Sequence, residues 1–99
     1  MEINTQSIHF SASGALLEFV EKKVSKLENV NQKVVSADVY LRLEKSEEKE
    51  NKISELKLNV PGHTLFAKEQ SNSFEESIDL AVESLRKQLQ KAKEKEMGR

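Results

Sequence analysis

With 99 residues, the chain is long enough for one domain with its own hydrophobic core and too short for two. It contains no cysteine, which excludes disulfides, thiolate metal sites and a cysteine nucleophile, and the imidazoles of His9 and His63 alone do not form a zinc site. The formal net charge of −1 argues against a nucleic-acid ligand, but the charges are distributed so unevenly that the sum does not decide the question.

The N-terminal part of the chain predicts a strand and a helix. A short apolar segment containing Ile3, Ile8 and Phe10 predicts the strand. From about Ala15 to Glu28, apolar residues recur at spacings of three and four, the pattern of a helix that buries one stripe. The stripe consists of Leu16, Phe19, Val20, Val24 and Leu27. Either Ser11 or Ser13 can cap the first turn, since a serine hydroxyl accepts a hydrogen bond from an unpaired amide there.

Three strands are predicted in the middle of the chain. Apolar and polar residues alternate from Ala37 to Leu43, as in a strand with one buried face. The charged segment from Glu44 to Lys52 cannot bury itself and predicts an exposed loop. A third strand over Leu56 to Val60 ends at the turn dipeptide Pro61-Gly62, and a fourth over Leu65 to Gln70 follows it.

A second, longer helix is predicted from Phe74 to at least Ala92, after the capping cluster Ser71-Asn72-Ser73. Its apolar stripe consists of Phe74, Ile78, Ala81, Leu85, Leu89 and Ala92. The order is therefore β-α-β-β-β-α, which predicts an α+β domain with two helices on one face of a four-stranded sheet. The pattern alone does not fix the order of the strands.

Charges are segregated along the second helix. The acids Glu75, Glu76, Asp79 and Glu83 fill its first half, and the bases Arg86, Lys87, Lys91, Lys93 and Lys95 fill its second. On a helical wheel the bases avoid the apolar stripe, so they are candidates for contact with a polyanion. The alternative is structural and, from pattern alone, stronger: acids near the start and bases near the end of a helix match its macrodipole.

A second basic group, Lys22, Lys23 and Lys26, lies on the first helix. Taken alone, it is explained by a solvated face on which Glu18 and Glu21 form i,i+4 pairs. If both helices cover the same sheet face, however, the two basic groups can border one groove. Such a groove would bind RNA phosphates with a steep salt dependence.

No catalytic constellation can be assembled from these residues. His9 and His63 have no neighbouring acid or nucleophile at a suitable spacing, no serine lies in a nucleophile elbow, and the glycines form no phosphate-binding loop. The apolar runs are too short to span a membrane, and the start of the chain is not a signal peptide. We expect a cytoplasmic protein that is not an enzyme, without cofactor, metal, membrane contact or small-molecule substrate.

Two segments carry a resemblance to a known family. The first is Ala15-Leu16-Leu17-Glu18-Phe19-Val20, continuing through Lys23, Lys26, Leu27 and Glu28; the second is Phe74-x-x-x-Ile78-Asp79, followed by Leu85, Gln88, Leu89, Lys91, Lys93 and Lys95. In these segments, and over essentially its whole length, the chain resembles the short ribosome hibernation promoting factors. This family is also called the ribosome-associated translation inhibitors, and an older name for its members is sigma-54 modulation proteins.

The resemblance implies a fold similar to double-stranded-RNA-binding domains and a function in translation. Members bind the small ribosomal subunit and its 16S rRNA in the channel for mRNA and tRNA, inhibit translation and stabilise hibernating ribosomes under stress or in stationary phase. Carried over by position, the contacts with rRNA phosphates are Lys23, Lys26, Arg86 or Lys87, Lys91, Lys93 and Lys95, with Lys22 as an extra contact.

Some positions depart from the family pattern. Asn72 and Phe74 stand where the family commonly has an aspartate and a tyrosine, and Ser84 stands where a relative can carry a lysine. We expect residues 1–99 to form a single ribosome-binding domain without the C-terminal dimerisation domain of long members, so that ribosome pairing needs a second factor. The alternative is a regulatory protein-interaction module with the same fold, a transcription or sigma factor modulator whose basic helix end meets a protein.

Overall fold

The structure is a computed structural model that describes residues 1–44 and 50–97, with side chains as far as Ala92. The elements in these residues are β1 (Glu2–Ile8), α1 (Gly14–Ser25), α2 (Leu27–Val30), β2 (Ser36–Leu43), β3 (Lys52–Val60), β4 (His63–Ser71) and α3 (Phe74–Met97). The predicted order of strands and helices is confirmed, with a short additional helix after the first.

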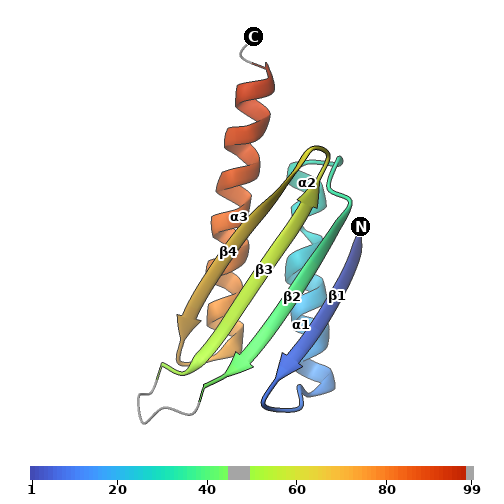
Figure 1. Ribbon diagram of the computed structural model, residues 1–99. Coiled ribbons are helices and arrows are strands. Elements are labelled where there is room, and N and C mark those ends of the chain that lie inside the picture. Colours follow the sequence, from blue (N-terminus) through green and yellow to red (C-terminus); the bar gives the residue numbers. More distant parts are fainter. Residues whose placement is uncertain (45–49, 98–99) are drawn as a thin grey trace.

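The four strands form one sheet in the order β1-β2-β3-β4, with β1 parallel to β2 and the other pairs antiparallel. The helices all cover the same face, and the other face is open (Figure 1). The predicted α+β architecture is therefore confirmed, and the structure supplies the strand order. The similarity to double-stranded-RNA-binding domains stays a prediction.

The core lies between the sheet and the helices, where the two predicted helical stripes meet the alternating side chains of the strands. From α1 and α2 it contains Leu16, Val20, Val24 and Leu27; from α3, Phe74, Ile78, Ala81, Leu85 and Leu89; from the sheet, Ala37, Val39, Leu41, Leu56, Leu58 and Ala67. Burying one large aliphatic side chain stabilises the fold by about 1.5 to 3 kcal/mol. This packing fixes which side of each helix faces solvent.

Both long helices begin at a serine cap. The hydroxyl of Ser13 accepts from the amide of Leu16 at 3.1 Å, and that of Ser73 accepts from the amide of Glu76 at 3.1 Å. Of the two serines that could cap the first helix, Ser13 does so. The turn between β3 and β4 contains Gly62 with a φ of +88°, a left-handed conformation that glycine adopts without steric cost.

Several predicted boundaries differ from the structure: β1 ends at Ile8, before Phe10, and β4 begins at His63, not Leu65. The first helix does not run unbroken to Glu28: at Lys26, ψ is −19° and the amide bonds to Lys23, three residues back, which tightens the turn and separates α1 from α2. The third strand begins at Lys52, not Leu56, and the amide of Glu44 bonds to the carbonyl of Asn51 where β2 and β3 end. The predicted exposed loop is therefore shorter, and its residues 45–49 lie outside the described residues.

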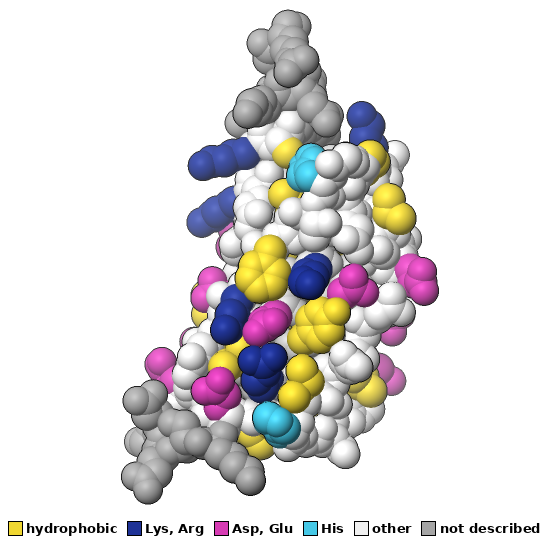
Figure 2. Space-filling view, viewed as in Figure 1, with side chains coloured by type: hydrophobic (Ala, Val, Ile, Leu, Met, Phe, Trp, Pro, Cys, Tyr) yellow, Lys and Arg dark blue, Asp and Glu magenta, His cyan; other side chains and the backbone are white. Residues whose placement is uncertain are grey.

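The open face of the sheet is polar with scattered apolar side chains (Figure 2). The strand register places Asp38, Tyr40 and Arg42 of β2 beside Glu55 and Lys57 of β3 and Phe66 and Lys68 of β4. An antiparallel sheet that packs one face on helices commonly leaves the other in water. This face is the second large surface of the molecule, opposite the helices.

Candidate nucleic-acid interface

The basic group of the first helix faces solvent at the C-terminal end of α1. The buried stripe of Leu16, Val20 and Val24 holds the other side of this helix against the core. Lys22 and Lys26 are exposed, and within the described residues neither forms an ion pair. Cations near the C-terminal end of a helix interact favourably with its dipole, so the fold tolerates both lysines there without acidic partners. Both are therefore available to a polyanion.

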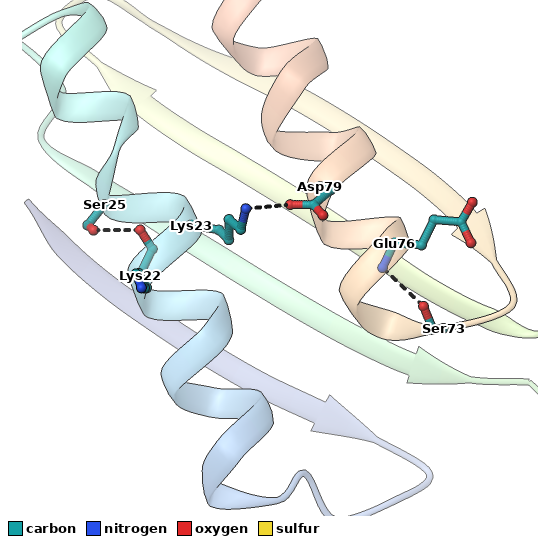
Figure 3. Close-up of polar contacts among 6 residues, drawn as sticks. All are labelled: Lys22, Lys23, Ser25, Ser73, Glu76 and Asp79. Carbon is teal, nitrogen blue, oxygen red and sulfur yellow. Dashed lines mark hydrogen bonds and ion pairs between the residues drawn. The ribbon is translucent and has the colours of Figure 1, made fainter.

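Lys23 lies on the side of α1 that faces α3. Its ammonium group is 3.3 Å from a carboxylate oxygen of Asp79 and 5.5 Å from the centre of the Phe19 ring. Figure 3 shows Lys23 and Asp79 pointing toward each other across the space between the helices. The two side chains are only partly exposed, 33% and 51%. Lys23 therefore ties α1 to α3, and Asp79 offsets part of the charge it would present to a phosphate.

Arg86 is held by an acid on its own helix. Its guanidinium donates to both carboxylate oxygens of Glu83, at 2.6 and 2.9 Å. The hydrogen bonds from Arg86 lower the pKa of Glu83, and the same contacts raise the pKa of Arg86. Because the carboxyl pKa is lowered in the fold, this pair is intact above the ordinary glutamate range and is lost as the pH falls through the lowered pKa. At neutral pH the Arg86 guanidinium is therefore bound to Glu83, and a phosphate would have to compete with that carboxylate.

Lys87 and Lys91 lie on a different side of α3. They are exposed and line a surface hollow together with two acids, Glu69 of β4 and Glu83 of α3. Between them in sequence, the Gln88 side-chain amide donates to the carbonyl of Phe66 at 3.0 Å, which fixes this side of the helix to the edge strand. At 100° per residue, Arg86 lies about 20° from Asp79 around the helix, whereas Lys87 and Lys91 are rotated by about 80° and 120°.

The described residues do not place Lys87 and Lys91 beside the lysines of the first helix, and a common groove that includes Lys93 and Lys95 stays a prediction. Both helices do cover the same sheet face, and the Lys23–Asp79 ion pair bridges the space between them. Lys22 of α1 and Lys26 at its C-cap lie on one side of α3, whereas Lys87 and Lys91 flank the β4 edge on its other side. The side chains of Lys93 and Lys95 lie outside the described residues, although their backbone belongs to α3.

Sequence reasoning missed Asp79 as the partner of Lys23, since only the packing of α1 against α3 brings them together. It also missed the aromatic and basic side chains of the open face, which were treated only as the polar half of the strand alternation. A signal was present, since rings and cations at outward positions of neighbouring strands share one surface.

The described residues contain no group of three or more histidine, cysteine or acidic side chains that could hold a metal ion. His9, at the end of β1, has a φ of +70°, a left-handed conformation found in turns. Nor does this part of the chain include a helix long and apolar enough to cross a membrane.

Comparison with known proteins gives a consistent result. The family model described as "Sigma 54 modulation protein / S30EA ribosomal protein" matches residues 3–97. The chain belongs to this family. It is 31% identical to the ribosome hibernation promoting factor of Azotobacter vinelandii over 99 residues, which cover all of this chain and 89% of that factor. The resemblance inferred from the sequence is thereby confirmed.

Solved structures of similar proteins share the fold. A ribosomal subunit interface protein from Coxiella burnetii superposes with a TM-score of 0.83 at 26% identity, covering 94% of this chain and 98% of that one. The N-terminal domain of Protein Y from Thermus thermophilus superposes with a TM-score of 0.79 at 24% identity, covering 92% and 98%. The chain thus matches the S30EA family model in sequence and shares its fold with these two solved structures.

Proposed function

We propose that this protein binds ribosomes and holds them inactive. The observation that carries the proposal is the full-length similarity to a protein named ribosome hibernation promoting factor. The exposed Lys22, Lys26, Lys87 and Lys91 support it, because none of the four forms an ion pair within the described residues and a ligand of ribosomal RNA needs cations that can reach phosphates.

In this proposal the domain binds the small ribosomal subunit through its 16S rRNA, in the channel that mRNA and tRNA use, and it blocks translation by occupying that space. The lysines contact phosphates and position the domain by charge, with little reading of base sequence. The protein acts in the cytoplasm as a binding partner and not as a catalyst. Under stress or in stationary phase it stabilises idle ribosomes, and pairing of ribosomes requires a second factor.

The test is sedimentation of the purified protein with empty ribosomes over a series of salt concentrations, together with in vitro translation. We expect the protein to pellet with the small subunit at low salt, to be released as salt rises, and to inhibit translation. The variant Lys22→Gln/Lys26→Gln/Lys87→Gln/Lys91→Gln should stay in the supernatant while its circular dichroism spectrum is unchanged, since all four side chains are exposed.

A wild-type protein that stays in the supernatant at all salt concentrations would refute the proposal. Binding to a sigma factor or polymerase without ribosomes would support the alternative of a transcription modulator. That alternative is not favoured, since relatives over the whole chain bear the name of hibernation factors.

A further inference from the structure

The open face of the sheet presents two aromatic rings to solvent. Phe66 of β4 is 47% exposed, and Tyr40 of β2 is half-buried on the same face, two strands away. Figure 2 shows large apolar side chains on this face, set among cationic and acidic ones. A phenylalanine with half its surface in water gains little by burial in its own fold, so its ring is available to a flat partner.

A lysine lies between the two rings. Lys57 of β3 pairs with Phe66 in the β3–β4 register, and its ammonium group is 5.9 Å from the centre of the Tyr40 ring. The strand spacing of about 4.8 Å puts the rings on a diagonal roughly 12 Å long with this cation in the middle. Rings and a cation at this spacing form a surface on which bases can stack while their phosphates meet positive charge.

Beside the rings, the cations Arg42, Lys57 and Lys68 outnumber the acids Asp38 and Glu55 by one. Glu55 of β3 is the acid at the centre of this region, and both Arg42 and Lys68 approach the same carboxylate oxygen, each at 3.7 Å. One acid therefore faces two cations, and Lys57, which lies opposite Asp38 in the β2–β3 register, adds a third. The next acid toward β1, Asp38, accepts hydrogen bonds from the side-chain amides of Asn4 and Asn59.

This region is continuous with the basic side of α3. The Gln88 side chain bonds to the backbone of Phe66 itself, and the neighbouring Lys87 and Lys91 line the hollow beside the β4 edge. A chain that crosses this edge would pass from the lysines of the helix to the rings of the sheet. The open face is therefore an extension of the candidate interface around β4.

We propose that the open face binds a single-stranded segment of RNA, whose bases stack on Phe66 and Tyr40 and whose phosphates meet Lys57, Lys68 and the α3 lysines. The proposal rests on the proposed function, because it takes Lys87 and Lys91 as RNA contacts. Stacking on aromatic side chains tolerates any base and requires unpaired nucleotides. The domain thus has two kinds of contact, charge on the helices and stacking on the sheet.

Tyr40 offers a direct probe, since it is the only tyrosine in the chain. Full-length protein labelled with 3-fluorotyrosine has a single fluorine resonance, which is followed by NMR while a twelve-nucleotide single-stranded oligoadenylate is added at low salt. We expect this resonance to shift with the single strand and to stay in place with a blunt RNA duplex of the same length. An unchanged resonance with the single strand would overturn the proposal.

The second measurement uses the variant Tyr40→Leu/Phe66→Leu, which keeps apolar side chains but removes both rings. Its affinity for a fluorescent oligoadenylate, measured by anisotropy, should fall at least tenfold, which corresponds to about 1.4 kcal/mol, the lower end of the worth of stacking one or two bases. The control Leu17→Ala, which removes an exposed apolar side chain on the helix side, should bind like the wild type.

Ribosome pelleting of the same variants separates the two proposals. If the rings stack on ribosomal RNA, Tyr40→Leu/Phe66→Leu should bind ribosomes several-fold more weakly than the wild type. The slope of log affinity against log salt should be unchanged, because the variant removes no charge. If the wild type pellets and the ring variant binds both oligoadenylate and ribosomes like the wild type, the stacking surface is wrong and the hibernation proposal stands. If the wild type binds oligoadenylate but not ribosomes, the proposed function is refuted, and the open face is still a stacking surface for single-stranded RNA.

Discussion

Ser54 and Ser77 are polar residues inside the core, and their hydroxyls lie 2.6 Å apart. Ser77 also donates to the carbonyl of Phe74 at 3.0 Å, so its single hydrogen is used there and Ser54 is the donor to Ser77. Removing either hydroxyl therefore leaves a different atom unpaired. In Ser77→Ala, the buried hydroxyl of Ser54 loses its acceptor. In Ser54→Ala, the Ser77 oxygen loses one donor, but its own hydrogen still bonds to the carbonyl of Phe74.

We expect Ser77→Ala to lower the free energy of unfolding by about 1 to 3 kcal/mol and Ser54→Ala to lower it by less. The double variant should be more stable than the sum of the two losses predicts, because both partners are then gone. Chemical denaturation of the three variants measures this cycle. Equal losses in the two single variants would show that the proton arrangement is different.

The ion pair between Lys23 and Asp79 sets a competition between folding and binding. We expect Asp79→Asn to change stability by no more than about 1 kcal/mol, since the pair is partly exposed. The same change should strengthen ribosome binding, because Lys23 no longer shares its charge with a carboxylate. Pelleting over a salt series and thermal unfolding measure the two effects.

The control for this prediction is Glu2→Gln, which removes one exposed negative charge from the edge strand, away from α1. If Glu2→Gln strengthens binding as much as Asp79→Asn, the effect comes from net charge alone. If Asp79→Asn weakens binding, Asp79 positions Lys23 instead of competing with the phosphate.

At the scale of elements, the start of α1 depends on one hydroxyl. Ser13 caps the helix by accepting from Leu16, whereas Ser11 precedes the cap on an exposed stretch. Ser13→Ala should lower the free energy of unfolding by about 1 kcal/mol, because the amide of Leu16 loses its acceptor. The matched change Ser11→Ala should leave the midpoint of urea denaturation where it is, and an equal loss in both variants would rule out a cap at Ser13 alone.

Helices and strands were predictable where one short-range pattern dominates. The stripe from Leu16 to Leu27 and the alternation from Ala37 to Leu43 are both found in the structure. The start of β3 was missed because Ile53 lies on the open face while Ser54 is buried beside Ser77, so the polarity of the strand is inverted there. The alternation of apolar and polar residues cannot predict that Ser54 is buried, because its hydrogen-bond partner Ser77 lies 23 residues away in the sequence.

At the scale of the whole molecule, the candidate site was only partly predictable. Lys22, Lys26, Lys87 and Lys91 were correctly assigned to solvent, since they lie off the buried apolar stripes of their helices. The contact of Lys23 with Asp79 and the position of Lys87 beside β4 depend on how far each helix is rotated in the packed domain. Local periodicity carries no information about that rotation relative to a neighbour.

The two lysine pairs lie on opposite sides of α3, so they contact ribosomal RNA independently if the proposed function holds. Each phosphate contact contributes roughly 0.7 to 0.9 to the slope of log affinity against log salt. We expect Lys22→Gln/Lys26→Gln and Lys87→Gln/Lys91→Gln each to reduce the slope by about 1.4 to 1.8, and the combined variant to reduce it by the sum.

The matched control is Lys33→Gln/Lys52→Gln, which removes two positive charges outside both pairs. Its slope should equal that of the wild type, because a slope counts the counterions released at contacts and not net charge. A reduction in this control equal to that of the lysine pairs would mean that binding follows overall charge. A reduction in only one of the two pairs would instead assign the RNA contact to that side of α3, and the other pair would then be the solvated, dipole-matched end of its helix.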